Sequence, residues 1–584
     1  MLYFMHWSIG DWGGALPCLI AVPRRINWTF VETFVALPLT SSGSTESIPS
    51  PGGRGDFGTV SIRASTLAAH CSLCYTCGLT EEQYPPATSS ISAQPIRAQP
   101  IVPMKITIIF PFVLCLFLAI GTNSASGTNN AVGATSSASL PPNIILIIID
   151  DLGWQCLSAF GNEDAQTPVL DRLAAEGTIF TNFYTTSPIC SPARTAVTVG
   201  QYPYRWRITS FLAERQLNER RGMAQWLDPS APTLPRMLQD AGYATGHFGK
   251  WHLGGQRDVG EAPLITEYGF DVSLTNFEGL GPRVLPLLNR FDGTEPRRYS
   301  LGSDRLGHPD EITWVDRNMV TPAFIDAALE LIKQAQADGK PFYLNLWLDD
   351  VHTPLYPSAE LRGDGSKRAL YLGVLVEMDS QLAVLFDFIR GDETLRNNTL
   401  ILFTSDNGHE HGAGSGGPLR ESKGTLYEGG VRVPLIVWGD GLLAPEAKGR
   451  RNDTAIFQGL DFVPSLLTIT GVAPPPGVML DGEDFSAVLL GNAITQERQA
   501  PIFWRRPPDR PGPANNRWPD LALRDGAWKF LMQFDGSRPQ LYNLDTDISE
   551  SQNLASQHPD LVTKYRNLLN EWNATMPRDA GQPE

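Results

Sequence analysis

The sequence predicts an α/β fold, in which a large, mostly parallel sheet is flanked by helices and a smaller C-terminal α+β subdomain is built on an antiparallel sheet. Three observations support this fold class. Apolar runs typical of buried strands alternate with helical segments between residues 143 and 403. Acidic, amide or histidine residues directly follow several of those runs. Three consecutive prolines at 474–476 then precede shorter strand-like segments and a closing helix. Such alternation is typical of parallel sheets.

The first expected element is a strand at 143–149, where the run NIILIII is apolar after its first residue and rich in β-branched side chains. A continuous run of this kind predicts a strand buried on both faces. The next expected element is a short helix that Gly177 ends. That helix covers residues 169–177. The elements expected after it are, in chain order, a strand at 178–183, a helix at 234–242, a strand at 243–248, a helix at 322–337, strands at 342–348, 398–403, 521–524 and 528–531, and a helix at 559–572.

Composition and charge limit the classes of function. The chain has 584 residues, 42% of them hydrophobic and 18% charged, which is typical of a globular protein. The formal net charge of −16 argues against a nucleic-acid partner, because nucleic-acid binders carry a basic stripe. An anionic substrate is still allowed, because a pocket can be locally basic on an acidic protein.

Residues 104–127 have the features of a secretory signal peptide: Lys105, an apolar core at 106–120 and small residues around Ala125. Signal peptides act at a true N-terminus, so residues 1–103 are interpreted as an unstructured upstream mis-translation. A transmembrane anchor is the alternative, but the apolar run is shorter than the roughly twenty residues that a span needs. We therefore expect no stable membrane span and a secreted or periplasmic protein.

The mature protein is expected to begin with a polar linker at 128–140, followed by a main domain at 141–475 and a C-terminal subdomain at 476–584. Of its cysteines only Cys156 and Cys190 remain after cleavage, so the protein is not a disulfide scaffold. The upstream CSLCYTC motif has metal-like spacing, but nothing downstream completes a zinc site.

Polar side chains follow the first and last strands of the main domain. Asp150 and Asp151 come directly after the first, and Asp406 and Asn407 follow the last. Active-site groups of parallel sheets gather at the carboxyl ends of the strands. Four oxygen donors suit Ca²⁺ or Mg²⁺ rather than zinc. Either pair alone is also a common turn sequence, but together the two pairs favour a metal site.

Several basic side chains lie in short, glycine-containing or proline-containing segments. Lys250 and His252 of GKWHLG point to the same side if that segment is extended. His352 lies in VHTP, and Lys423 lies in a glycine-rich turn. A lysine beside a histidine suits the binding of an oxyanion during proton transfer.

The segment SPICSPAR places Cys190 four residues before Arg194. If Ser191 caps a helix and Pro192 takes its first position, Cys190 lies at a helix N-terminus, where a thiolate is favoured. A cysteine hydrolase is therefore one interpretation. The oxygen-donor set does not fit it, because a thiolate nucleophile needs no hard-cation site.

Taken together, these motifs resemble those of the type I sulfatases, which are part of the alkaline phosphatase superfamily. Cys190-Ser-Pro-Ala-Arg194 matches the Cys-x-Pro-x-Arg signature of that family. The resemblance covers roughly residues 141–575, and the closing segments LRDGAWK and QLYNLD are also similar to that family's. Five further motifs follow in the family's order, and they are Asp150-Asp151, GKWHLG (249–254), VHTP (351–354), SDNG (405–408) and the segment 423–432.

The resemblance implies that Cys190 is oxidised to Cα-formylglycine by a formylglycine-generating enzyme. One hydroxyl of the hydrated aldehyde would then attack sulfur. The implied metal is Ca²⁺, with Mg²⁺ as an alternative, and its ligands are Asp150, Asp151, Asp406, Asn407 and the modified Cys190. The implied catalytic residues are Cys190, Arg194 (orienting the diol), Lys250, His352 and Lys423 (holding sulfate, with His352 or Lys423 protonating the leaving alcohol) and His252 (deprotonating the second hydroxyl).

One departure from the family lies after the arginine, where Leu-Thr-Gly is usual and this chain has Thr198-Val199-Gly200. The expected activity is hydrolysis of a sulfated carbohydrate or an aryl sulfate. His409, His411 and the basic segment 504–510 are candidates for binding that substrate. The alternatives are a phosphomonoester or phosphonate hydrolase of the same superfamily and a non-catalytic binder of sulfated glycans.

Overall fold

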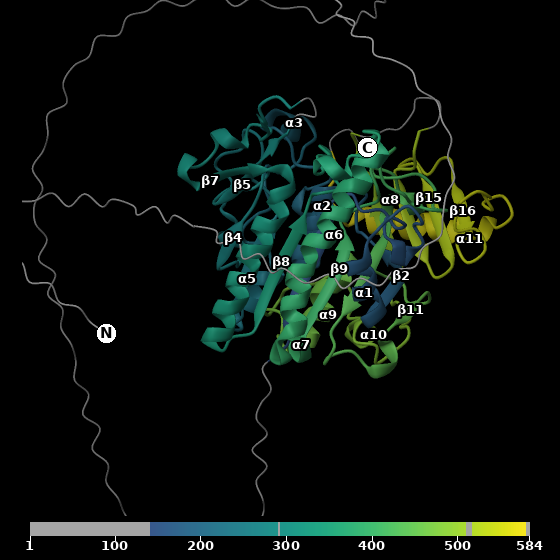
Figure 1. Ribbon diagram of the computed structural model, residues 1–584. Helices are drawn as coiled ribbons and strands as arrows, with labels where there is room; N and C mark the ends of the chain where they lie inside the picture. Colours follow the sequence, from purple (N-terminus) through teal and green to yellow (C-terminus); the bar gives the residue numbers. More distant parts are fainter. Residues whose placement is uncertain (1–140, 290–292, 510–516, 580–584) are drawn as a thin grey trace, which may run out of the picture. The chain divides into compact units, whose positions relative to one another are not determined.

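The computed structural model describes residues 141–289, 293–509 and 517–579 (Figure 1). The predicted upstream segment, signal peptide and linker lie outside the described residues. The strands of the largest sheet all lie before residue 460, and those of a separate four-stranded sheet all lie after residue 500. The predicted boundary at residue 475 between a main domain and a C-terminal subdomain stays a prediction.

The centre of the large sheet is β1 (Asn143–Ile149), and all seven of its residues are buried. It lies between β8 (Phe342–Leu348) and β9 (Thr399–Ser405), and both neighbours run parallel to it. On the far side of β8, β3 (Ala244–Gly249) and then β4 (Val272–Leu274) continue the parallel arrangement. The predicted parallel sheet is confirmed.

The other half of the sheet reverses direction once. The strand β10 (Arg432–Trp438) is antiparallel to both β9 and β2 (Thr178–Tyr184). Two short strands, β11 (Arg450–Asn452) and β12 (Phe457–Gln458), pair parallel with β2. Because β10 runs antiparallel to β9, it ends at the opposite edge of the sheet from the residues that follow β1 and β9.

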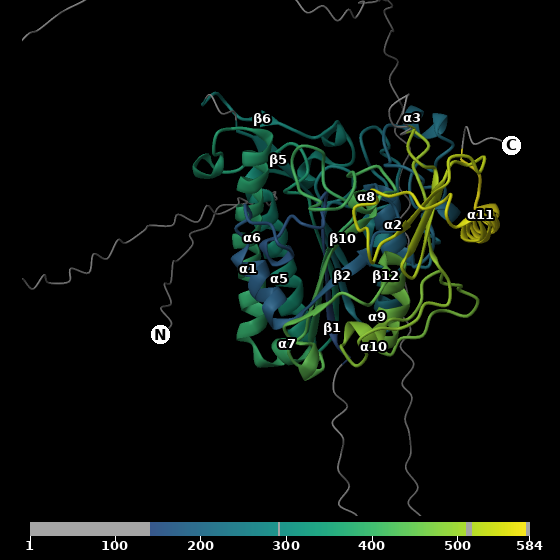
Figure 2. The ribbon, with the colours of Figure 1, turned by 90° about the vertical axis from the view of Figure 1, so that its right-hand side faces the viewer.

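Helices cover both faces of this sheet (Figure 2). The first face packs α1 (Pro168–Glu176), α5 (Val320–Asp338) and α6 (Lys367–Gly391) against alternate residues of β1. The second face packs side chains of α4 (Leu234–Asp240) and α9 (Phe462–Thr470), among others, against the intervening residues of β1. Both faces of the strand are therefore buried, as its sequence predicts.

The remaining elements complete the fold. A three-stranded sheet with order β6-β5-β7 lies between β4 and α5 in the sequence, and a four-stranded antiparallel sheet with order β13-β14-β15-β16 lies near the C-terminus. These elements are β5 (Arg283–Leu288), β6 (Arg297–Arg298), β7 (Ile312–Asp316), β13 (Ile502–Arg505), β14 (Leu521–Asp525), β15 (Trp528–Met532), β16 (Gln540–Asn543), α2 (Cys190–Val199), α3 (Arg215–Arg220), α7 (Glu393–Asn398), α8 (Glu428–Val431), α10 (Ser486–Leu489) and α11 (Pro559–Ala574).

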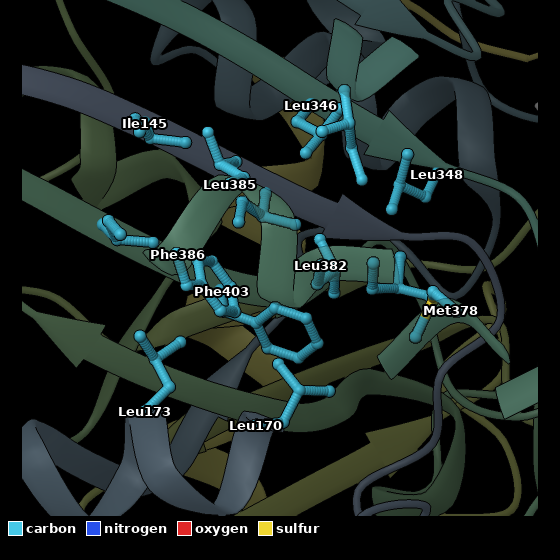
Figure 3. Close-up of a cluster of buried hydrophobic side chains, with 14 of the residues drawn as sticks. Ile145, Leu170, Leu173, Leu346, Leu348, Met378, Leu382, Leu385, Phe386 and Phe403 are labelled. Atoms are coloured by element: carbon cyan, nitrogen blue, oxygen red, sulfur yellow. The ribbon is translucent and has the colours of Figure 1, made fainter. Parts of the chain in front are cut away.

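The helix α6 has the length and apolar composition of a membrane span, but half of its most apolar window is buried inside the protein. Leu382, Leu385 and Phe386 of this helix belong to the core that also contains Ile145 of β1 and Leu170 of α1 (Figure 3). Its apolar side chains are therefore explained by packing between the sheet and α1.

Replacing Leu382 with alanine is expected to lower the free energy of unfolding by about 2–5 kcal/mol, because it leaves a cavity in a close-packed core. Leu382 is 0% exposed. Urea denaturation followed by circular dichroism measures the change. Val384→Ala in the same helix is the control, because that side chain is 54% exposed and its loss should have little effect. Equal destabilisation by both variants would contradict this account of α6.

Candidate active site

Four oxygen-bearing side chains meet where β1 and β9 end. Ile149 is in register with Ser405, so the residues that follow the two strands emerge side by side. Asp150, Asp151, Asp406 and Asn407 are all buried, with at most 2% of each residue exposed. The sequence prediction that these four side chains gather at one edge of the sheet is confirmed.

The donor set fits a hard divalent cation. Ligand atoms of Asp150, Cys190 and Asp406 all lie within 4.8 Å of one another. Oδ1 of Asp150 and Oδ1 of Asn407 are buried, and neither accepts a hydrogen bond from the described residues. Buried oxygens without donors are costly unless something compensates them. A cation bound by these atoms would provide that compensation.

Burial and neighbouring charges shift the pKa values of two of these carboxylates in opposite directions. Burial opposes ionisation of Asp150, but the charges of Lys250, His352, Arg194 and Lys423 hold its pKa well below the ordinary value. Burial, together with the neighbouring Asp150 charge, raises the pKa of Asp406 to about 7. Crowded acids with separated pKa values are typical of functional sites.

Three cationic side chains, of which Lys423 is partly exposed, pair with these carboxylates. Nζ of Lys250 lies 2.6 Å from Oδ2 of Asp150, and Nζ of Lys423 lies 2.6 Å from Oδ1 of Asp151. Nη2 of Arg194 lies 2.8 Å from Oδ2 of Asp406. Arg194 also donates through Nη1 to the backbone oxygen of Lys250 at 2.8 Å. The predicted basic residues thus surround the predicted metal site.

Cys190 is the first residue of α2 and is only 3% exposed. The expectation that Ser191 caps this helix is wrong, because Ile189 is the N-cap and Oγ of Ser191 accepts from the backbone nitrogen of Leu212 instead. Burial raises the pKa of the Cys190 thiol to about 12, although Lys423 and Lys250 lower it. The free cysteine is therefore a thiol, and a thiolate nucleophile is disfavoured.

The two candidate histidines differ in their surroundings. Nε2 of His252 lies 2.9 Å from the backbone oxygen of Leu212, and Nδ1 lies 3.1 Å from Oε2 of Glu278. Burial lowers the pKa of His252 to about 3, whereas the Glu278 charge raises it. His352 is one quarter exposed, and its Nε2 lies 3.9 Å from Oδ2 of Asp151.

These side chains open into a cleft of about 240 Å³. Five predicted residues line it, and they are Cys190, Lys250, His252, His352 and Lys423. Arg194 is fully buried beside Asp406 and is not among the lining residues. The motifs of the sequence do not indicate the rest of the wall, whose missed lining residues include Phe211, Arg257, Phe277, Glu278, Tyr299 and Leu301.

The two histidines predicted to bind substrate, His409 and His411, have different surroundings. His409 is packed against Gly153 and Gly416, and burial lowers its pKa to about 4. His411 is exposed, and its backbone oxygen accepts from Nζ of Lys367. Neither histidine is among the described residues that line the cleft.

The basic segment that begins at Trp504 also does not form the predicted rim. Trp504 is 0% exposed and donates from Nε1 to the backbone oxygen of Thr185. The two arginines that follow it are buried as well, and Arg506 pairs with Asp520. These side chains hold the C-terminal sheet in place, so the predicted rim role is corrected for residues 504–506.

Comparison with known proteins gives consistent matches. The family model described as Sulfatase matches residues 142–472. N-acetylgalactosamine-6-sulfatase of Canis lupus familiaris is 32% identical over 381 residues, which cover 64% of this chain and 70% of the relative. Arylsulfatase A of Bos taurus is 32% identical over 450 residues, which cover 74% of this chain and 83% of the relative.

Solved structures show the same architecture. The crystal structure of Ps i-CgsB in complex with k-i-k-neocarrahexaose matches with a TM-score of 0.60 and 25% identity, covering 74% of this chain and 92% of that one. The PsFucS1 sulfatase from Pseudoalteromonas sp. matches with a TM-score of 0.58 and 25% identity, covering 74% and 90%. The fold and the relatives thus agree with the motifs that line the cleft.

Proposed function

This chain belongs to the sulfatase family and is a sulfuric ester hydrolase, and we propose that it removes sulfate from a sulfated carbohydrate or an aryl sulfate. We propose further that its nucleophile is a formylglycine made from Cys190 and that its metal is Ca²⁺. The observation that carries the proposal is the position of Cys190, which lines the same cleft as Lys250 and Lys423 and lies against the carboxylates.

The proposed metal ligands are Asp150, Asp151, Asp406, Asn407 and the modified residue 190. Oxygen donors of this kind suit Ca²⁺, with Mg²⁺ as the alternative. Ca²⁺ bound there would supply positive charge to the nucleophilic oxygen and to the sulfate group. The hydrate of a formylglycine supplies a hydroxyl in place of the thiol.

The surrounding side chains would bind the ester and move its protons. Lys250 and Lys423 would hold sulfate oxygens, together with His352. His352 or Lys423 would protonate the departing alcohol, and His352 has the more exposed side chain of the two. His252 would take the proton from the second hydroxyl, and burial favours the neutral ring that this role needs. Arg194 would orient the diol.

The burial of α2 restricts when Cys190 can be modified. All ten residues of this helix are buried, so an enzyme cannot reach Cys190 in the folded protein. Thr198, Val199 and Gly200, which depart from the usual family sequence, end the same helix, and Gly200 has a left-handed φ of 67°. A formylglycine-generating enzyme would therefore act on the chain before it folds, during export directed by the proposed signal peptide.

Mass spectrometry of the peptide that contains Cys190 tests the nucleophile directly. In active enzyme we expect this residue to have lost its sulfur and to carry a carbonyl group that reacts with a hydrazide probe. The peptide that contains Cys156 is the internal control, because that thiol is equally buried but lies outside the cleft. An intact thiol at residue 190 in enzyme that hydrolyses 4-nitrophenyl sulfate would contradict the proposal.

A further inference from the structure

We propose that Glu278 is a specificity-determining residue, whose buried negative charge disfavours phosphate monoesters relative to sulfate monoesters in this cleft. The inference rests on the proposed function, because it concerns the group that the same site binds. Among the six missed wall residues named above, Glu278 is the one with an acidic side chain.

The carboxylate of Glu278 faces three cationic or protonatable groups. Oε2 lies 3.1 Å from Nδ1 of His252 and 3.5 Å from Nζ of Lys250. Oε1 lies 4.0 Å from Nη2 of Arg257. Glu278 is only 3% exposed, yet it lines the cleft beside Cys190. Its charge therefore lies close to Lys250, and it acts on any anion that this lysine holds.

The backbone fixes this position firmly. Glu278 has a φ of 76° and His252 has a φ of 56°, and both values lie in the left-handed region that residues other than glycine rarely adopt. The backbone nitrogen of His252 donates to the backbone oxygen of Glu278 at 2.8 Å. Residues held in this region of backbone conformation cluster at functional sites, where the surrounding structure fixes them.

A carboxylate in an anion-binding cleft needs an explanation. Burial opposes its ionisation, but the neighbouring His252 ring and the charges of Lys250 and Arg257 lower the pKa of Glu278 below the ordinary value, which favours the negative carboxylate near neutral pH. It must therefore repel any anion held by Lys250 and Lys423. A phosphate monoester carries close to two negative charges above pH 7, whereas a sulfate monoester carries one. The repulsion is accordingly about twice as large for the phosphate ester.

The test compares two substrates of the same shape on one preparation. Glu278→Gln is expected to raise the ratio of kcat/KM for 4-nitrophenyl phosphate to kcat/KM for 4-nitrophenyl sulfate at least about tenfold at pH 8. Misfolded protein cancels in this ratio, because both assays use the same sample. Glu278→Asp should keep the ratio near that of the wild type. Glu214→Gln is the matched control, because that carboxylate also faces Arg257 but is 45% exposed.

A second measurement does not depend on turnover. In a Cys190→Ala background, adding Glu278→Gln is expected to tighten the binding of phenyl phosphate about tenfold relative to phenyl sulfate, as measured by calorimetry. An unchanged ratio in both experiments, with the two substrates affected equally, would overturn the inference and leave Glu278 as a positioning residue for His252. Failure of the wild type to hydrolyse 4-nitrophenyl sulfate would instead count against the proposed function. The ratio of the affinities for phenyl phosphate and phenyl sulfate would still decide the role of Glu278.

Discussion

Cys190→Ala is expected to lower kcat for 4-nitrophenyl sulfate by at least about 10⁴-fold, which is the scale of losing a catalytic nucleophile. Alanine cannot become an aldehyde, so no hydroxyl would face the ester from residue 190. The fold should survive, because Cys190 is the first residue of α2 and alanine is compatible with that position. Initial rates and thermal denaturation, measured on the same preparation, check both expectations.

The matched control is Cys156→Ala. Cys156 is also buried, and its sulfur accepts from the hydroxyl of Tyr371 and the backbone nitrogen of Ser415. Its loss should lower stability and leave kcat almost unchanged. Residual activity of Cys190→Ala above a few per cent of the wild type would exclude residue 190 as the source of the nucleophile.

The metal site was predictable because it depends on strand order and register. The runs that became β1 and β9 are mostly apolar and fully buried, and acidic or amide residues follow each of them. Once two such strands are parallel neighbours, as β1 and β9 are, the residues after them must meet. Lys250 and Lys423 could be predicted as site residues for a different reason, because the order of their motifs along the chain matches that of a known family.

The cleft wall could not be predicted in the same way. Phe277 and Glu278 precede β5 in a loop without periodicity, and the position of Glu278 depends on a left-handed backbone angle that nothing in its side chain indicates. Phe211 and Arg257 come from other loops. Contacts among such segments are set by tertiary packing, so one sequence gives no signal for them.

The two histidines after Asn407 follow the metal-site residues closely in sequence, but neither is among the described residues that line the cleft, so their role in substrate binding stays a prediction. The chain turns after the metal-site residues, where the backbone nitrogen of Gly408 donates to the backbone oxygen of Gly430. His409 then packs against Gly153. The predicted capping role of Ser191 is wrong because its hydroxyl oxygen accepts a hydrogen bond from the backbone nitrogen of Leu212, which lies in another segment of the chain.

Asp406→Ala is expected to have two effects, because this carboxylate serves the metal site and also balances a buried arginine. Arg194 is 0% exposed and places Nε 2.9 Å and Nη2 2.8 Å from Oδ2 of Asp406. Leaving that guanidinium without its nearest carboxylate should cost about 3–5 kcal/mol of stability. Losing one oxygen ligand should weaken Ca²⁺ binding at least about a hundredfold, because losing a group that only hydrogen-bonds to a metal ligand already lowers metal affinity by up to about a hundredfold.

Asp406→Asn separates these effects, because its amide oxygen still accepts from Arg194 but carries no charge for a cation. We expect this variant to unfold closer to the wild type than Asp406→Ala while binding Ca²⁺ almost as poorly, as measured by thermal denaturation and by metal content after dialysis. Asp440→Ala is the control, since Asp440 follows β10 at the opposite edge of the sheet and is paired with Lys448 near the surface. If Asp406→Asn retains a full equivalent of Ca²⁺ with wild-type affinity, the metal does not depend on this carboxylate, and the donor set at the ends of β1 and β9 has been assigned incorrectly.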